Sequence, residues 1–308
     1  MRCRARLLGR MVAGVDVNAR DLWQRIHAWP RRLRWPLKGG LLAVTVLLTL
    51  FPKVWLVPVW IERLRHLNEV VDSTYPALAG LEAQVAARVG EKAELADVLL
   101  PVEETVYRRI PYAYDWETWG VVDYLPSVAE VFAMGREDCD GRAVVAASLL
   151  QRLGYEAWLA TDLKHTWVVA RDPSAKEPVE YELMGPGEGE KTLSGGAAGT
   201  RMKLTLATVR NLARATIFGI AVFPVTRELI ILAALVVTAA QPRSSWWRRA
   251  VGCLLLTTAL FLLRGAGSFR GTEVAWWVCV AGGLATVASG GLLLAVKGAS
   301  RRSFPGPL

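Results

Sequence analysis

A cysteine and a histidine are the residues with the clearest chemistry in this chain. Cys139 lies in a polar turn, Gly135-Arg-Glu-Asp-Cys-Asp-Gly141, directly before the apolar run 143–153, which predicts a helix. The first-turn N–H groups and the helix dipole favour a thiolate, so we expect the thiol pKa to lie below about 8.5. His165 opens a β-patterned stretch further along the chain. The pair predicts a Cys–His acyl-transfer site; a buried structural cysteine and a satisfied histidine are the alternative.

The elements that must position this pair follow from hydrophobic periodicity. The cysteine helix is predicted over 139–153 and ends at Gly154. Period-two alternation then predicts three short strands, at 155–161, 165–171 and 179–183. Upstream, helices are predicted over 61–100, 101–110 and 127–134, and an aromatic-rich loop over 111–125. The expected fold class is α+β, with the cysteine helix packed on a small antiparallel sheet.

Four apolar segments predict transmembrane helices, at 39–60, 215–241, 250–266 and 274–296. The net charge of +9 is unevenly divided. Residues 62–205 carry 24 Asp and Glu against 15 Lys and Arg, whereas the remaining residues carry 22 basic and 4 acidic side chains. The basicity therefore belongs to the membrane flanks, and a nucleic-acid partner is not expected. Lys/Arg-rich flanks stay cytoplasmic, so both termini are predicted inside and the acidic region outside.

These signals divide the chain into consecutive segments. They are a basic cytoplasmic arm (1–38), a first transmembrane helix (39–60), a helical stalk (61–100), the Cys–His domain (101–185), a linker (186–214), three further transmembrane helices (215–241, 250–266 and 274–296) and a cytoplasmic tail (297–308). Tryptophans among the arginines of the arm suit a segment lying on the membrane surface, and a disordered basic tail is the alternative.

Two further features constrain the membrane part and the redox chemistry. Arg227 and Glu228 interrupt the second apolar segment. An unpaired charge in mid-bilayer is costly, so we expect these residues near the outer interface or paired with each other. Cys139 is the only cysteine between the first and second predicted spans, which leaves no partner for a disulfide within the soluble domain.

A wider motif pattern surrounds the cysteine, over roughly residues 100–185. It comprises Tyr112-Ala-Tyr-Asp115, Trp119-Gly120, Asp123-Tyr124, Pro126, Glu130, Gly135, Asp138-Cys139, Ala143 and Leu153-Gly-Tyr155. The pattern resembles the signature of the bacterial transglutaminase-like cysteine proteinases, a family that includes periplasmic proteases acting on biofilm adhesins. The resemblance implies a papain-like or transglutaminase-like fold and cysteine peptidase activity.

The resemblance also implies roles for individual residues. Cys139 would be the nucleophile, and His165 the general base and then the general acid. Family spacing places the orienting carboxylate at Glu182, where the family usually has Asp. Glu180 shares its strand face and is the alternative, and Asp172, in a turn, is the weakest candidate.

Oxyanion and metal ligands follow from the same resemblance. The main-chain N–H of the nucleophile is one oxyanion donor, with a side chain from Trp119 or Tyr124 as the second. The family binds calcium through acidic residues that flank the nucleophile, and Asp138 and Asp140 match those positions. The family's next acidic residue is replaced by Gly141, so helix N-capping by either aspartate is the competing interpretation.

Two functions fit these observations. The first is a membrane-anchored, extracytoplasmic cysteine peptidase or related acyl transferase of the bacterial inner membrane, acting on a protein or peptide with no obligatory cofactor. The second is a non-catalytic docking subunit of a membrane complex. Lipid is an expected partner in both, and Gly282-Gly283 and Gly290-Gly291 in the last span could pack against partner helices.

Overall fold

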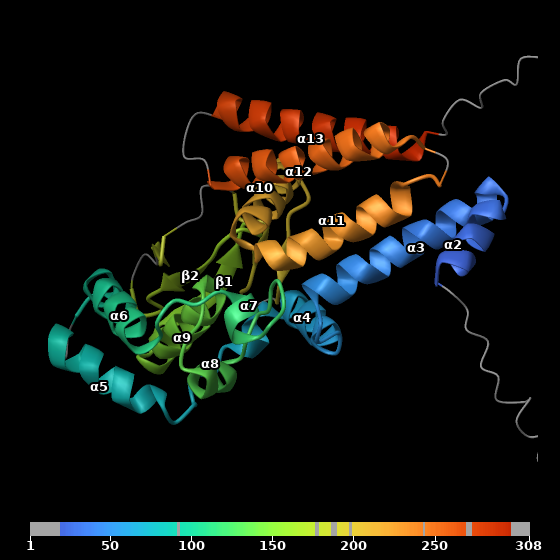
Figure 1. Cartoon of the computed structure of the whole chain (residues 1–308). Helices are drawn as coiled ribbons and strands as arrows, with labels where there is room; N and C mark the ends of the chain where they lie inside the picture. Colours follow the sequence, from blue (N-terminus) through green and yellow to red (C-terminus); the bar gives the residue numbers. More distant parts are fainter. Residues whose placement is uncertain are drawn as a thin grey trace, which may run out of the picture.

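The structure is a computed structural model that describes residues 19–90, 93–175, 179–185, 190–196, 199–242, 244–268 and 273–296. These residues are mostly helical, with a small antiparallel sheet at one end and long helices extending away from it (Figure 1). The elements are α2 (Ala19–Ala28), α3 (Arg31–Leu50), α4 (Leu56–Arg65), η1 (Leu67–Val70), α5 (Leu78–Val89), α6 (Leu95–Arg109), α7 (Asp115–Thr118), α8 (Val128–Met134), α9 (Cys139–Arg152), β1 (Glu156–Thr161), β2 (Thr166–Arg171), β3 (Glu180–Leu183), β4 (Leu193–Ser194), β5 (Arg201–Met202), α10 (Leu206–Val222), α11 (Val225–Ala239), α12 (Trp246–Ser268) and α13 (Glu273–Ala295).

The sheet domain is built around α9, a helix buried on all sides. Every residue from Ala143 to Leu150 is buried, so this helix needs apolar neighbours all round. β1 and β2 cover one side of it, and α5, α6 and α8 pack against it elsewhere. The predicted stalk 61–100 is therefore part of the core, because Leu78, Val85 and Val102 of α5 and α6 are fully buried with α9. Their helical apolar stripe is a core face.

The three predicted strands are confirmed as β1, β2 and β3, each within one residue of the predicted bounds. They belong to an antiparallel sheet of order β3-β2-β1-β4-β5, in which Val168 of β2 pairs with Leu183 of β3. The segment 186–214, predicted to be a linker, also contributes β4, β5 and the start of α10. Strands of two residues offer no alternation to detect, and the Gly-rich composition hid them.

Among the described residues, α3, α12 and α13 are long and apolar enough to cross a membrane, and the bent pair α10 and α11 makes a fourth if it counts as one span. That pair corresponds to the predicted span 215–241, but it bends by 109° at Phe223-Pro224. Proline disfavours helical geometry in the residue before it, and Phe223 is extended, with ψ of 148°. The predicted continuous helix is therefore two helices.

The first predicted span also differs from the structure. α3 ends at Leu50 and the chain reaches α4 through Pro52, whereas apolarity alone predicts one helix over 39–60. Proline has no N–H to continue a helix. The residues that follow turn back onto the domain, where Trp60 packs against its core.

α12 and α13, the counterparts of the predicted spans 250–266 and 274–296, form an antiparallel hairpin with close glycine contacts. A Cβ at Gly283 would lie 2.7 Å from Leu263, and a Cβ at Gly290 would lie 2.9 Å from the main chain of α12. Gly282 and Gly291 have nothing within 4 Å. Two of the four glycines predicted to serve partner helices thus pack within the chain.

Charged side chains gather where the long helices meet the sheet domain. Glu228 pairs with Arg264 at 2.5 Å, and not with its neighbour Arg227 as one expectation had it. Arg264 also donates to the last carbonyls of α10, which a helix end leaves without intrahelical partners. Arg227 donates to the Gly120 carbonyl at 2.8 Å and so connects α11 to the domain.

Candidate functional site

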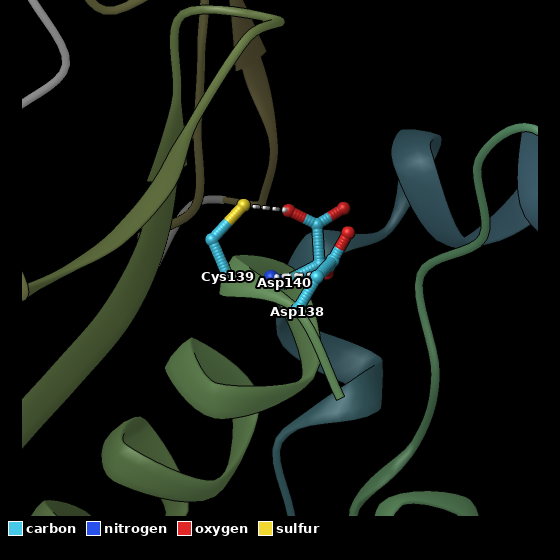
Figure 2. Close-up of side chains that lie close together, drawn as sticks. All are labelled: Asp138, Cys139 and Asp140. Carbon is cyan, nitrogen blue, oxygen red and sulfur yellow. Dashed lines mark hydrogen bonds between the residues drawn. The ribbon is translucent and has the colours of Figure 1, made fainter. Parts of the chain in front are cut away.

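Cys139 is the first residue of α9, as the sequence predicts. Asp138 is the N-cap, and its carboxylate accepts a hydrogen bond of 3.0 Å from the Asp140 N–H, which confirms the capping interpretation for this residue. The Cys139 Sγ lies 3.4 Å from Oδ1 of Asp140. Figure 2 shows the sulfur between the strands and the two carboxylates. The thiol is therefore flanked on its own helix by acidic groups only.

The start of β2 faces the thiol from the other side. The main-chain N–H of Thr166 is directed at the Cys139 sulfur, and the Thr166 side chain hydrogen-bonds to Asp140. His165 directly precedes Thr166, and its charge is felt by the Asp140 carboxyl. The fold thus brings the cysteine of α9 to the strand end that carries the histidine, as the sequence predicts.

A main-chain carbonyl holds the His165 ring. Nε2 lies 2.9 Å from the Met184 carbonyl oxygen, which can only accept, so Nε2 carries the proton and Nδ1 is left as a base. The ring stacks near Trp167, and the His165 N–H donates to Asp162. Met184 itself has φ of +70°, a left-handed conformation that is unusual for a side chain of this size. This carbonyl fixes the tautomer.

Neither glutamate of β3 takes the orienting position. Glu182 is paired with Lys191 at 2.8 Å, and its register partner on β2 is Val169, four residues from His165. Strands rise about 3.3 Å per residue, so that offset separates Glu182 widely from the ring. Glu180, opposite Arg171, lies further away still and is exposed. The expected hydrogen bond from a β3 carboxylate to the imidazole is therefore absent among the described residues. Asp172, the weakest candidate, accepts from Ser174 in its own turn.

The two side chains proposed as oxyanion donors are already engaged. The indole N–H of Trp119 donates to Glu137. The Tyr124 hydroxyl donates to Glu130 at 2.9 Å and accepts from Arg63 at 2.8 Å. The phenol of Tyr112 is a nearer candidate, since the charges of Cys139 and Asp138 contribute to raising its pKa.

Three acidic residues that the sequence did not single out lie beside Asp138 and Asp140. They are Asp115, Asp123 and Glu137, from the aromatic-rich loop and the turn before α9. Glu137 is fully buried, and burial raises its pKa to about 7. Burial and the charge of Asp140 likewise raise the pKa of Asp123 to about 7.

The carboxyl pair at the bottom of this group is tightly coupled. The pKa of Asp115 is raised by burial and by its acidic neighbours, although one of its oxygens accepts the Tyr124 N–H at 2.7 Å. Its other oxygen has no hydrogen-bond donor among the described residues and faces the Asp123 carboxyl. One proton shared by the two carboxyls, or a bound cation, would satisfy this arrangement.

The acidic surroundings reverse one expectation about the thiol. The pKa of Cys139 is raised above its ordinary value, first by burial and then by Asp138 and Asp140, although the Thr166 N–H acts in the opposite direction. The favourable effect of a helix N-terminus is about 0.3–1 kcal/mol, less than one pKa unit, and two adjacent carboxylates outweigh it.

The same carboxylates fit a calcium ion in their donor chemistry. Ligand atoms of Asp115, Glu137 and Asp138 lie within 4.8 Å of one another, as do those of Asp138, Cys139 and Asp140. Oxygens about 2.3–2.6 Å from one calcium ion lie at most about 5 Å apart, so the first spacing is compatible with a shared ion.

Gly141 explains why the acidic residue of the family is missing at its position. A Cβ there would lie 2.8 Å from the Glu137 Cβ, so only glycine lets this glutamate pack beneath the helix. The sequence held a signal for Glu137, because it sits beside Asp138 in the charged turn. Nothing local marked Asp115 as its neighbour.

Comparisons of the chain with protein-family models, with curated proteins and with solved structures gave no match.

Proposed function

We propose that the chain is a membrane-anchored, transglutaminase-like cysteine peptidase or related acyl transferase. The observation that carries the proposal is the pairing of Cys139, at the start of α9, with the start of β2, where His165 is oriented by the Met184 carbonyl. A thiol at a helix N-terminus beside a tautomer-fixed imidazole is the arrangement that thiol acyl transfer requires. The papain-like assignment of the domain belongs to the same proposal.

The reaction follows from the free nitrogen of the imidazole. Nδ1 of His165 removes the proton from the Cys139 thiol, and the sulfur attacks the carbonyl carbon of a peptide or amide. The protonated Nδ1 then gives its proton to the leaving amine as the C–N bond breaks. Water or a second amine attacks the thioester, loses its proton to Nδ1, and releases the thiolate. The Cys139 N–H and the Tyr112 hydroxyl are the proposed donors to the oxyanion.

The orienting group in this proposal is the Met184 carbonyl. It takes over the part first assigned to Glu182, because it already accepts from Nε2 and would stabilise the protonated ring. Glu182→Gln and Glu180→Gln should therefore each keep turnover within about twofold, since neither carboxylate contacts the imidazole. A strong loss in Glu182→Gln with an unchanged fold would return the role to that carboxylate.

Calcium is the proposed cofactor, held by Asp138 with Asp115 and Glu137 on one side or with Asp140 on the other. When bound, the ion would supply positive charge that lowers the pKa of the neighbouring carboxyls and of the thiol. Asp140 retains its own task in either case, because its carboxylate lies between the sulfur and Thr166.

The proposed topology places the sheet domain outside the cytoplasm and both termini inside the cell. The support is the charge division, with the acidic region 62–205 on one side and basic flanks on the other. In the structure, α3, α11, α12 and α13 extend from the same side of the domain (Figure 1). An enzyme reporter fused after Gly199 should be active only outside the cytoplasm, and one fused after Leu308 only inside. Opposite results at either point would refute this topology.

A thiol-reactive peptide electrophile applied to intact cells tests the function. Wild-type protein should become labelled at Cys139, and His165→Ala should slow labelling strongly while leaving the melting temperature close to that of the wild type. The purified full chain should hydrolyse peptide thioesters or esters, and Cys139→Ala should not. Hydrolysis that persists in Cys139→Ala would remove the proposal.

The alternative is a non-catalytic docking subunit. The raised pKa of Cys139 favours it, because a protonated thiol among carboxylates is a poor nucleophile. The unpacked faces at Gly282 and Gly291 also suit a partner helix. A wild-type chain that is inert toward every acyl substrate, with and without calcium, but that co-purifies with membrane partners would favour this function.

A further inference from the structure

A cavity of about 410 Å³ lies at the end of the long helices that is remote from the sheet domain. Its walls include Arg31, Arg34 and Trp35 from the first turns of α3, Gln241 after α11, and Leu292 and Ala295 from the last turns of α13. In Figure 1 these helix ends meet on the right, opposite the sheet. The cavity is therefore separate from the cysteine site.

One wall of the cavity carries buried positive charge. Arg34 is 5% exposed, and its Nε has no hydrogen-bond partner among the described residues, although Nη1 donates to the His27 carbonyl at 2.7 Å. Lys38, one turn further along α3, is 1% exposed; its Nζ lies 3.0 Å from Nε2 of His27 and over the rings of Trp23 and Trp35. These contacts neutralise neither cation.

No carboxylate in the described parts of the chain forms an ion pair with Arg31, Arg34 or Lys38. Buried charges without a counter-charge cost free energy, so a bound anion would stabilise this end of the helices. Guanidinium groups match phosphate oxygens in geometry and charge.

The opposite wall determines what kind of anion fits. Leu292, Ala295 and Val296 of α13 are apolar, and Trp35 adds an aromatic face. A free phosphate would leave these walls without contacts. A phospholipid would place its phosphate on the arginines and its glycerol and first methylenes on the apolar side. Basic pockets between transmembrane helices are known to take lipid headgroups.

We propose that this cavity binds one anionic phospholipid of the adjacent leaflet, with its phosphate between Arg31 and the free Nε of Arg34. The proposal does not depend on the function of the cysteine site. The lipid would connect α3 to α13, which belong to opposite ends of the chain, and would neutralise the charge buried on α3.

Native mass spectrometry of the delipidated full chain, titrated with phosphatidylglycerol, tests the proposal. Arg31→Gln should weaken binding at least about fivefold, because the side chain lines the cavity and makes no other recorded polar contact. Arg32→Gln is the matched control, since Arg32 carries the same charge one residue on and lies outside the lining; it should change affinity by less than about twofold. Ala295→Phe, which fills the cavity without changing charge, should weaken binding as Arg31→Gln does.

Two further arms identify the ligand. Phosphatidylcholine should bind at least about tenfold more weakly than phosphatidylglycerol, and glycerol 3-phosphate should not displace the bound lipid at millimolar concentration. Equal losses in Arg31→Gln and Arg32→Gln would show general surface attraction and overturn the site. Displacement by glycerol 3-phosphate, or full affinity in Ala295→Phe, would overturn the lipid assignment.

Discussion

Replacing Glu137 by glutamine should remove much of the pH dependence of the domain's stability. Burial raises the pKa of this carboxyl from its ordinary 4.5 to about 7, so the folded chain holds a proton that the unfolded chain releases. A raised carboxyl pKa contributes stability that is complete below pH 4.5 and is lost as the pH rises through 7. A shift of about 2.5 units corresponds to about 3 kcal/mol. In a domain of this size that amounts to about 6–12 °C in melting temperature.

The assay is thermal unfolding of the full chain in lipid nanodiscs with a chelator present, followed by tryptophan fluorescence at pH 5 and pH 8. The wild type should lose the stated amount over this interval, and Asp123 should add to the loss in the same direction, since its pKa is also raised to about 7. Glu137→Gln should be less stable at pH 5, because an amide cannot accept from both Trp119 and the Asp138 N–H, but its stability should change less with pH.

The exposed carboxylate of Asp172 provides the control. Hydrogen bonds from Ser174 lower its pKa, so Asp172→Asn should leave the difference between pH 5 and pH 8 as it is in the wild type. Added calcium should flatten the wild-type dependence, because a bound cation favours the ionised carboxyls. If Glu137→Gln loses as much stability between the two pH values as the wild type does, the reasoning from its buried proton fails.

Three other outcomes follow from the site. Met184→Pro, which cannot adopt φ of +70°, should displace the carbonyl from the histidine and lower turnover at least about tenfold, whereas Met184→Gly should keep it, as measured by ester hydrolysis beside matched melting curves. Gly141→Ala should destabilise the chain by about 1–3 kcal/mol through the clash with the buried glutamate, while Gly80→Ala, with nothing within 4 Å in α5, should be neutral or stabilising by thermal melting. The alkylation rate of Cys139 in chelator should show a midpoint above about 8.5, and Asp140→Asn should move it downward; a midpoint that stays fixed would contradict the proposed effect of the carboxylate.

The sequence predicted those parts of the site that depend on local signals. An aspartate cap before an apolar run located the start of α9 at Cys139, and alternation located the strand that follows His165. The orienting group could not be predicted in this way, because the Met184 carbonyl is a main-chain atom and any residue type supplies one. The choice of Glu182 assumed that a side chain must do this work.

The acidic group and the membrane helices show the same division. Asp115 and Glu137 are 22 positions apart, and only the packing of the loop against the turn before α9 brings them together. Apolarity located the membrane helices correctly as a class, yet it could not show where they end. Pro52 and Pro224 decided that, and each interrupts an apolar run without lowering its hydrophobicity enough to be noticed.

The loop after α7 is fastened to two membrane helices at once. The Val122 N–H donates to the Leu50 carbonyl at the end of α3, and Arg227 of α11 donates to the neighbouring Gly120. Two attachment points separated along one loop remove the rotation that a single flexible tether would allow. The entrance to Cys139 therefore keeps one height and one heading above the bilayer, and a substrate anchored in the same membrane would search for it by lateral diffusion in two dimensions.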